Sequence, residues 1–196
     1  MGVCAFGGGI ASLSCLQIVY RTFIELGIWK RHSFMNDINA VIDVLQLQPH
    51  PEGGFYREMH RASSLIRESN GNSKNAYSSI YYLLSGHDFS AWHRIQSDET
   101  WFFHVGSDIA IHYFDSKNEL AVVQLGLESM HFQATIPAGT WFAAKPLHAE
   151  SFCLVSCVVG PAFTFTEFEM GKRQTLLDTF GITALHKEAI EALSRV

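Results

Sequence analysis

Short β-strand patterns recur along most of this chain, and their regular spacing limits its fold more than any other feature. Segments rich in β-branched and aromatic residues follow one another about every ten residues, with Gly, Asn or Pro between them. These segments are residues 53–58, 78–86, 100–106, 108–115, 119–126, 132–136, 151–160 and 162–168. Such an order favours an all-β sandwich or barrel over βαβ units, and a double-sheet jelly roll fits it best.

Helical patterns stand at both ends of this β region. Apolar residues recur at helical spacing between residues 36 and 47, with Asn36 or Asp37 as a possible N-cap and prolines at 49 and 51 to end the helix. A second helix is expected over 183–196, with Ala184, Leu185, Ala189, Ile190 and Leu193 on one face. We therefore expect a β domain over 35–182 with a short N-terminal and a C-terminal helix. The polar residues 61–76 predict a loop over the barrel or the tip of a long hairpin.

The first 34 residues differ in composition from the rest of the chain. Residues 3–20 carry no charge, and Arg21 and Glu25 then interrupt the apolar run. This run is at the short end of the roughly 20 residues that cross a bilayer, and it lacks the basic start of a signal peptide. We predict an extension, either disordered or an extra helix, with a weak membrane anchor and a signal peptide as the alternatives. No membrane partner is expected for the remainder.

Composition narrows the function classes. The 196-residue chain is 47% hydrophobic, enough to bury the core of one domain, and its net charge of −5 disfavours a nucleic-acid partner. The four cysteines, at positions 4, 15, 153 and 157, lack C-x-x-C spacing, which indicates reduced thiols in a cytoplasmic protein. Cys153 and Cys157 share one face of a predicted strand and are interpreted as core residues.

Two segments, AWHRIQSDETWFFHVG at 91–106 and IPAGTWFAAKP at 136–146, carry an ordered set of glycines and potential ligands. Gly86, His93, Glu99 and Gly106 follow one another at the spacing of a metal-binding motif, and Pro137-x-Gly139 comes later. In this order the chain resembles the cupin superfamily over about residues 36–180. More narrowly, together with HPEGGFYRE at 50–58, it resembles a single-domain branch of unknown function.

The resemblance implies a cupin jelly roll, or double-stranded β-helix, with an incomplete set of metal ligands. Ile95 stands where the cupin motif has its second His, and Phe142 stands where the last His is expected. His93 and Glu99 remain, whereas zinc or iron generally needs three or four converging ligands. We therefore expect no metal cofactor, with a divalent ion at His93 and Glu99 as the alternative.

Strand alternation predicts what the barrel interior contains. If His93 points inward, so does Ile95, and Glu99, Trp101 and Phe103 share a face on the next strand. An aromatic interior with a small polar cluster is typical of an organic-ligand pocket, although Tyr82, Trp101, Phe103 and Phe142 also suit plain core packing. His93 is predicted to be a general base oriented by Glu99 or Asp98, or else a structural histidine.

The same region also resembles the cupin sugar-nucleotide epimerases of the dTDP-4-dehydrorhamnose 3,5-epimerase type. Their R-G-x-F-x-E segment matches GGFYRE, which implies Tyr56 and Glu58 as ligand contacts, while Gly53 stands in the place of the arginine. His93 matches their base. The residues that would replace the missing arginine on phosphate are Arg57, Arg94 and Lys145. Trp92 or Trp101 would stack on a ring, and Tyr113 or Tyr82 would face the base.

These resemblances predict a nucleoside diphosphate or sugar nucleotide bound in the barrel by a metal-independent epimerase or isomerase. The sequence leaves turnover itself open. A non-catalytic small-molecule-binding cupin is one alternative, and a metal-dependent isomerase or oxygenase is another. The resemblance further implies a homodimer formed through the N-terminal strands around residues 45–58.

Overall fold

The computed structural model describes residues 37–68 and 71–195. The predicted extension over 1–34, with Cys4 and Cys15, lies outside the described residues, as does Asn36. The chain divides into two units, residues 1–41 and residues 42–196. The helix predicted between 36 and 47 is α3 (Ile38–Leu45). Asp37 is its N-cap, since one carboxylate oxygen accepts hydrogen bonds from the backbone N–H of Asn39 (3.0 Å) and Ala40 (3.4 Å).

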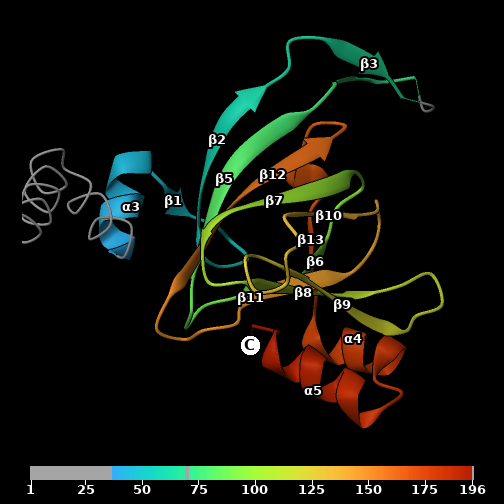
Figure 1. Cartoon of the computed structure of the whole chain (residues 1–196). Helices are drawn as coiled ribbons and strands as arrows, with labels where there is room; N and C mark the ends of the chain where they lie inside the picture. The colour runs from blue at the N-terminus through green and yellow to red at the C-terminus, as the bar shows by residue number, and fades with distance from the viewer. Residues whose placement is uncertain (1–36, 69–70, 196) are drawn as a thin grey trace, which may run out of the picture. The chain divides into compact units, whose positions relative to one another are not determined.

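Unit 42–196 is a sandwich of two antiparallel sheets (Figure 1). The larger sheet has the order β1 (Gln48–Pro49), β2 (Phe55–Arg61), β5 (Ser78–Ser85), β12 (Phe152–Gly160), β7 (Asp98–Gly106) and β10 (Gln133–Ile136). The smaller has the order β13 (Glu169–Met170), β6 (Ser90–Arg94), β11 (Phe142–Pro146), β8 (Ile109–Phe114) and β9 (Leu120–Leu125). The predicted all-β jelly roll is confirmed. β11 was not predicted, because only the Pro137-x-Gly139 turn before it stands out in the sequence.

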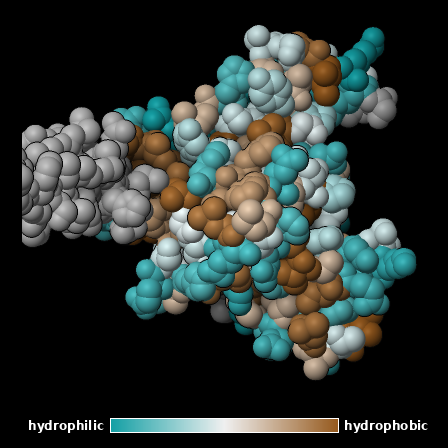
Figure 2. All heavy atoms as spheres, viewed as in Figure 1, coloured by the Kyte–Doolittle hydropathy of each residue, from teal (hydrophilic) through white to brown (hydrophobic). Residues whose placement is uncertain are grey.

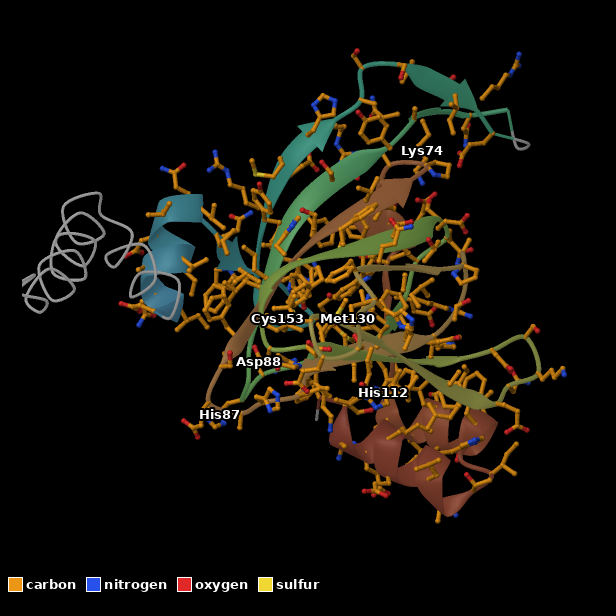
Figure 3. All side chains as sticks on the ribbon, in the orientation of Figure 1. Lys74, His87, Asp88, His112, Met130 and Cys153 are labelled. Atoms are coloured by element: carbon orange, nitrogen blue, oxygen red, sulfur yellow. The ribbon has the colours of Figure 1, made fainter. Side chains whose placement is uncertain are left out.

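The main core lies between the two sheets and follows the two-residue period of the strands. On β12, Val155 pairs with Tyr82 of β5, and Cys157 pairs with Trp101 of β7; all four side chains are buried. The expectation that Cys153 and Cys157 are core residues is met, since both thiols are free and buried. Figure 3 shows Cys153 within the sandwich. The inward face therefore consists of aromatic and small apolar side chains, which leave room for a cavity.

A second core forms where two helices cover the smaller sheet. Figure 1 shows α4 (Arg173–Phe180) and α5 (Ala184–Ala192) beneath that sheet. Trp92 and Phe114 from the sheet are buried together with Leu176 of α4 and Ile190 of α5. The sequence predicted α5 but not α4, whose eight residues present only two buried side chains. Within α5 the predicted apolar face is wrong at Ala184 and at Leu185, both of which are exposed.

The polar stretch 61–76 forms a hairpin of β3 (Leu65–Arg67) and β4 (Ser73–Asn75), which extends away from the sandwich in Figure 1. The prediction of a hairpin tip is therefore confirmed. Its side chains Leu65 and Ile66 are exposed, and brown hydrophobic atoms stand out at this end of the molecule in Figure 2. Within the described residues, no helix is long and apolar enough to cross a membrane.

The predicted strand over 162–168 is wrong, because the chain forms the 3₁₀ helix η1 (Phe165–Glu167) there. Two hydrogen bonds hold the preceding residues against β4 and β5: Ala162 N–H donates to Asn75 O (3.0 Å) and Phe163 N–H donates to Ser78 Oγ (3.0 Å). Glu167 forms an ion pair with Lys74, which Figure 3 shows at the hairpin side of the molecule. These contacts hold residues 162–167 against the sandwich in place of the backbone hydrogen bonds that a regular strand would form.

Candidate functional site

A cavity of about 350 Å³ lies in the sandwich. Its wall comes from β1, from the inward faces of β2, β5, β7 and β12, from β6, and from the segment around η1. The lining residues that can titrate or ionise are His50, Glu52, Tyr56, Glu58, Arg61, His93, Glu99 and Cys157. The phenylalanines that line it are Phe163, Phe165 and Phe168. Aromatic walls with a few placed polar groups are typical of small-molecule sites.

The turn between β1 and β2 places Glu52 in this cavity. Gly53 and Gly54 follow it with φ of +121° and +67°, backbone conformations that glycine adopts at little cost. The Gly53 N–H donates to His50 O (3.0 Å), and the Gly54 N–H donates to the Asp88 carboxylate (2.8 Å). The sequence HPEGG therefore forms a tight turn that presents the glutamate side chain inward.

Arg195, which follows α5, holds the same turn from outside. Its Nε donates to the Glu52 carbonyl oxygen (3.0 Å), and its Nη2 donates to Asp88 Oδ1 (2.6 Å) and to Phe89 O (2.9 Å). The backbone N–H of Ala91 on β6 donates to the same Glu52 carbonyl (2.9 Å). Figure 3 shows Asp88 at the end of the molecule away from Lys74. The backbone of Glu52 is therefore fixed to β6 and to the C-terminal segment together.

Glu52 and His93 form a buried pair inside the cavity. His93 Nε2 lies 3.2 Å from Glu52 Oε2, and both side chains are almost fully buried. The other carboxylate oxygen, Glu52 Oε1, accepts a hydrogen bond from Ser90 Oγ (2.9 Å). Ser90 and His93 both come from β6, so one short strand supplies the histidine and a second anchor for the carboxylate.

The hydrogen bonds of His93 fix its tautomer. Nδ1 lies 2.7 Å from the carbonyl oxygen of Ala91, which can only accept, so Nδ1 carries a hydrogen. If neither Nε2 nor Glu52 Oε2 carried a proton, their lone pairs would face each other at 3.2 Å. The pair therefore holds one proton between Nε2 of the imidazole and the Glu52 carboxyl group.

His50 is a neutral neighbour of this pair. Burial lowers its pKa, and Glu52 opposes that effect only in part. Its Nδ1 accepts a hydrogen bond from the Glu52 backbone N–H (3.4 Å), so the 3.6 Å approach of Nδ1 to Glu52 Oε2 is not an ion pair. The His50 ring packs edge-on against Tyr56 at 4.6 Å between centroids. His50 therefore shapes the cavity without adding charge.

Glu99, on β7, is a second carboxyl group of the cavity with a different protonation state. Burial raises its pKa to about 8, and the nearby Glu52 carboxylate adds to the rise, while a hydrogen bond with the Cys157 thiol acts against it. Burial likewise raises the pKa of Cys157 well above its usual value, so the thiol stays protonated. At neutral pH Glu99 is therefore a carboxylic acid that can donate a proton.

The donor set does not fit a cupin metal ion. Ile95 and Phe142 contribute hydrocarbon where two imidazoles would be needed, and Glu52 engages the Nε2 atom of His93. A metal at Glu99 would also have to displace the proton that burial favours on this carboxyl group, whose pKa is raised to about 8. Within residues 37–68 and 71–195, no group of three or more His, Cys, Asp or Glu side chains is placed to hold a metal. The chemistry of the cavity is therefore derived from its side chains alone.

Some of the predicted site residues come together in this cavity. Those that line it are Tyr56, Glu58, His93 and Glu99. Phe142 lies behind the pair, with its ring 4.1 Å from the His93 ring, and Tyr82 donates its hydroxyl to Gly53 O (2.8 Å). The orienting partner of His93 is corrected: Glu52 and the Ala91 carbonyl occupy its two ring nitrogens, not Glu99 or Asp98. The catalytic role of His93 stays a prediction.

The predicted phosphate-binding residues lie outside the cavity lining. Arg57 points to the other face of β2, where its guanidinium donates to Leu45 O (3.1 Å). Arg94 forms an ion pair with Glu169 (2.6 Å), and Lys145 is exposed on β11. Strand alternation explains all three positions, because each neighbours a residue that faces a core or the cavity.

The predicted stacking tryptophans are core residues in the structure. Trp92 is fully buried in the second core, under α4 and α5. Trp101 and Phe103 are buried in the main core, where the Trp101 ring meets Tyr82 edge-on at 5.7 Å. Tyr113, proposed to face His93, packs against that main core. The positions of these aromatic residues therefore agree with core packing, which was the alternative to ligand binding.

The position of the missing epimerase arginine is sterically closed. A Cβ atom at Gly53 would lie 2.2 Å from Phe89 O and 2.0 Å from Arg195 Nη2, in a backbone conformation with φ of +121°. No side chain fits there without moving the backbone. An arginine contact to phosphate from this position is therefore excluded in this fold.

Sequence reasoning missed His50, Glu52, Arg61 and the phenylalanines around η1. The signal for Glu52 was present in HPEGG, a charged residue between a proline and two glycines, where a tight turn can direct one side chain inward. The metal motif places ligands only from His93 onward, and the epimerase resemblance points to Tyr56 and Glu58. Neither indicates Glu52, which stands about 40 residues before His93.

Comparisons with known proteins agree with this architecture. The family model described as "Cupin superfamily (DUF985)" matches residues 39–171. A solved structure from Shewanella oneidensis is 35% identical with a TM-score of 0.74, covering 82% of this chain and 99% of that one. A hypothetical protein from Leishmania major is 29% identical with a TM-score of 0.74, covering 82% of this chain and 100% of that one. No curated protein matches the sequence.

Proposed function

Because this chain belongs to the DUF985 family of the cupin superfamily, we propose that it binds a small molecule in the cavity and transfers protons to and from it without a metal. The observation that carries this proposal is the 3.2 Å contact between His93 Nε2 and Glu52 Oε2 in the cavity wall. A buried pair that holds one proton beside an open cavity is a ready acceptor or donor for a ligand.

Besides the Glu52–His93 pair, the cavity contains a carboxyl group that can donate a proton, that of Glu99. Glu99 is protonated at neutral pH, since its pKa is about 8, while Glu52 shares its proton with His93. A protonated carboxyl group placed in the same cavity as a pair that can accept a proton is an arrangement suited to acid and base roles. Glu99 would act as the proton donor, and the Glu52–His93 pair would act as the acceptor.

The reaction that suits these roles is isomerisation or epimerisation next to a carbonyl group. The pair takes the proton from the carbon beside the carbonyl, and Glu99 gives its proton to the carbonyl oxygen, which produces an enol. The pair then holds two protons, with the imidazole protonated on both nitrogens. Return of a proton to the same carbon, and of the enol proton to Glu99, restores both groups; delivery to the opposite face of that carbon gives the epimer.

Of the ligand predicted from the sequence, a nucleoside diphosphate or sugar nucleotide, this proposal keeps only the sugar. The cavity of about 350 Å³ is at the small end of the roughly 300–1,000 Å³ typical of ligand sites, and one sugar ring suits it better than a whole nucleotide. The alternative is a cupin that binds such a molecule without chemistry. Such a protein would bind the ligand without catalysing deuterium exchange.

Deuterium incorporation tests the proposal without knowledge of the product. The full chain, treated with EDTA, is incubated in D₂O with a panel of aldoses, ketoses and sugar nucleotides, and loss of the C–H signal beside the carbonyl is followed by NMR. We expect exchange in at least one compound, unchanged by EDTA. Exchange that requires an added metal, or none in any compound, would contradict the proposed chemistry.

We further propose a homodimer located in the cytoplasm. The outer edge of β2 is paired only by β1, at Phe55 and Tyr56, so the backbone from Arg57 to Arg61 forms a free edge among the described strands. Strand pairing with a second copy would cover that edge. Light scattering at micromolar concentration would give twice the chain mass. The free thiols of Cys153 and Cys157 support a reducing compartment, which cell fractionation tests.

A further inference from the structure

We infer that the cavity selects an uncharged ring compound with a carbonyl or hydroxyl groups and rejects its phosphorylated form. The inference rests on the proposed function, because it names the ligand class of the same site. Three features of the described lining support it: the pairing of its charges at the mouth, the neutral floor, and the wall of phenylalanine rings.

The mouth of the cavity holds one guanidinium, and that group is already engaged. Arg61 donates through Nε to Glu58 Oε1 (3.2 Å) and through Nη2 to Glu58 Oε2 (2.6 Å), a two-point ion pair. Its Nη1 donates to Phe163 O (3.1 Å). No other Lys or Arg lines the described part of the cavity, and the neighbouring Lys74 is paired with Glu167.

A phosphate group that reached Arg61 would also meet Glu58. The two residues lie three positions apart on β2, so the carboxylate cannot move far when a phosphate displaces it. The phosphate would exchange one anion for another at the guanidinium and leave two negative charges side by side. An exposed ion pair is weak by itself, but this repulsion makes an anionic ligand unfavourable.

The floor of the cavity adds no net charge at neutral pH. The Glu52–His93 pair holds one proton and balances itself, and burial keeps His50 neutral. Glu99 carries its proton at pH 7. A ligand charge placed here would be removed from water without an opposite charge to compensate, which is costly.

The third side of the cavity offers flat hydrocarbon. Phe165 is 55% exposed although it is a large aromatic residue, and its ring lies nearly parallel to His50, at 25° and 6.4 Å between centroids. Phe163 packs edge-on against it at 5.0 Å. Hydrogen bonds to β4 and β5 hold this segment in place, so the surface exists before a ligand arrives. The apolar face of a sugar ring or a similar ring fits such a wall.

Matched pairs of ligands test this inference on the full chain. The dissociation constants of D-glucose and glucose 6-phosphate, D-fructose and fructose 6-phosphate, and D-ribose and ribose 5-phosphate are measured by ligand-observed NMR. We expect the uncharged member of at least one pair to bind at least 10-fold tighter than its phosphate. Equal or tighter binding of the phosphates, or no binding of any uncharged member, would overturn the inference.

A variant that removes the carboxylate paired with Arg61 gives a second, independent test of the ligand preference. Glu58→Gln frees the Arg61 guanidinium, so the preference for the uncharged member should fall at least 10-fold through tighter binding of the phosphate. Glu169→Gln is the matched control, because it removes the carboxylate paired with Arg94, outside the cavity lining, and should leave the preference unchanged. An unchanged preference in Glu58→Gln would overturn the charge argument.

Failure of this inference is distinguishable from failure of the proposed chemistry. Selective binding of an uncharged ring without deuterium exchange would support the ligand class and contradict the proton transfer. Deuterium exchange that is faster in the phosphorylated sugars would support the proton transfer and contradict the ligand class.

Discussion

His93 Nε2 lies 3.2 Å from Glu52 Oε2, while His93 Nδ1 is held 2.7 Å from the Ala91 carbonyl. Both ring nitrogens therefore have partners, and the carboxylate that completes the arrangement comes from a turn far earlier in the sequence. We expect Glu52→Gln and His93→Gln each to lower the deuterium exchange rate by about 100-fold or more, because each removes the proton acceptor. The measurement is the initial rate of C–H loss at saturating ligand.

The matched control for these variants is His186→Gln. His186 is also buried, and its Nδ1 is bonded to the Phe180 carbonyl (2.8 Å), but it lies outside the cavity lining. Its loss should lower the melting temperature and leave the exchange rate of the folded protein unchanged. If His186→Gln reduced exchange as much as His93→Gln, the effect would be structural rather than chemical.

The free energy of unfolding should decrease as pH rises, because of Glu99. Its folded pKa is about 8, against an ordinary value of 4.5, so between these values the folded state holds a proton that the unfolded state lacks. The stabilisation of the protonated state is complete below about pH 4.5 and is lost as pH rises through about 8. The resulting decrease in the free energy of unfolding is on the order of a few kcal/mol, since one pKa unit corresponds to about 1.4 kcal/mol.

Urea unfolding at several pH values between 5 and 8.5 measures this dependence. In Glu99→Gln the decline should be much smaller, because glutamine does not titrate. The prediction is wrong if wild type and Glu99→Gln show parallel curves over this interval. The same variant should also lose deuterium exchange, since glutamine cannot donate a proton to the carbonyl oxygen.

Arg195 is expected to act on the site through Glu52. Arg195→Ala removes the hydrogen bonds to Glu52 O, Asp88 and Phe89 O and should cost about 1–2 kcal/mol of stability, a value kept small because the ion pair is partly exposed. The carboxylate should also lose its fixed position, so the maximal exchange rate should fall more than ligand affinity does. Arg195→Lys keeps the charge and should restore part of the rate. Equal losses in rate and affinity would indicate a purely structural role.

Metal binding should appear when the two missing ligands are supplied. The double variant Ile95→His/Phe142→His adds imidazoles at the cupin ligand positions beside His93 and Glu99. We expect it to bind Co²⁺ with a visible absorption band, whereas wild type gives none, because three nitrogen ligands and a carboxylate suffice. A band of similar intensity in wild type would contradict the donor-set argument.

Much of the fold could be predicted because several of its strands follow a two-residue period. Val155 and Cys157 face the core as alternation requires, and Asp37 caps α3 as its side chain suggests. The segment 162–168 alternates as well, yet it forms η1, because hydrogen bonds to β4 and β5 and the Glu167–Lys74 ion pair outweigh its strand preference. Such tertiary contacts have no local signature in the sequence.

The candidate site was only half predictable, for a similar reason. His93 and Glu99 could be found from their place in a motif, and both line the cavity. Glu52 could not be paired with His93, since their approach depends on the β1–β2 turn, on Asp88 and on Arg195, which no spacing rule connects. Arg57 and Arg94 failed as site residues because alternation turns each away from its inward-facing neighbour.

The proton held between His93 and Glu52 is tested by the ¹⁵N NMR spectrum of the His93 ring in the full chain at pH 7, assigned by comparison with His93→Gln. We predict a hydrogen on Nδ1 and a proton shared between Nε2 and the Glu52 carboxyl. In Glu52→Gln, Nε2 should instead show the shift of an unprotonated nitrogen, because the amide donates to it. An Nδ1 without hydrogen, or identical His93 spectra in wild type and Glu52→Gln, would contradict the account.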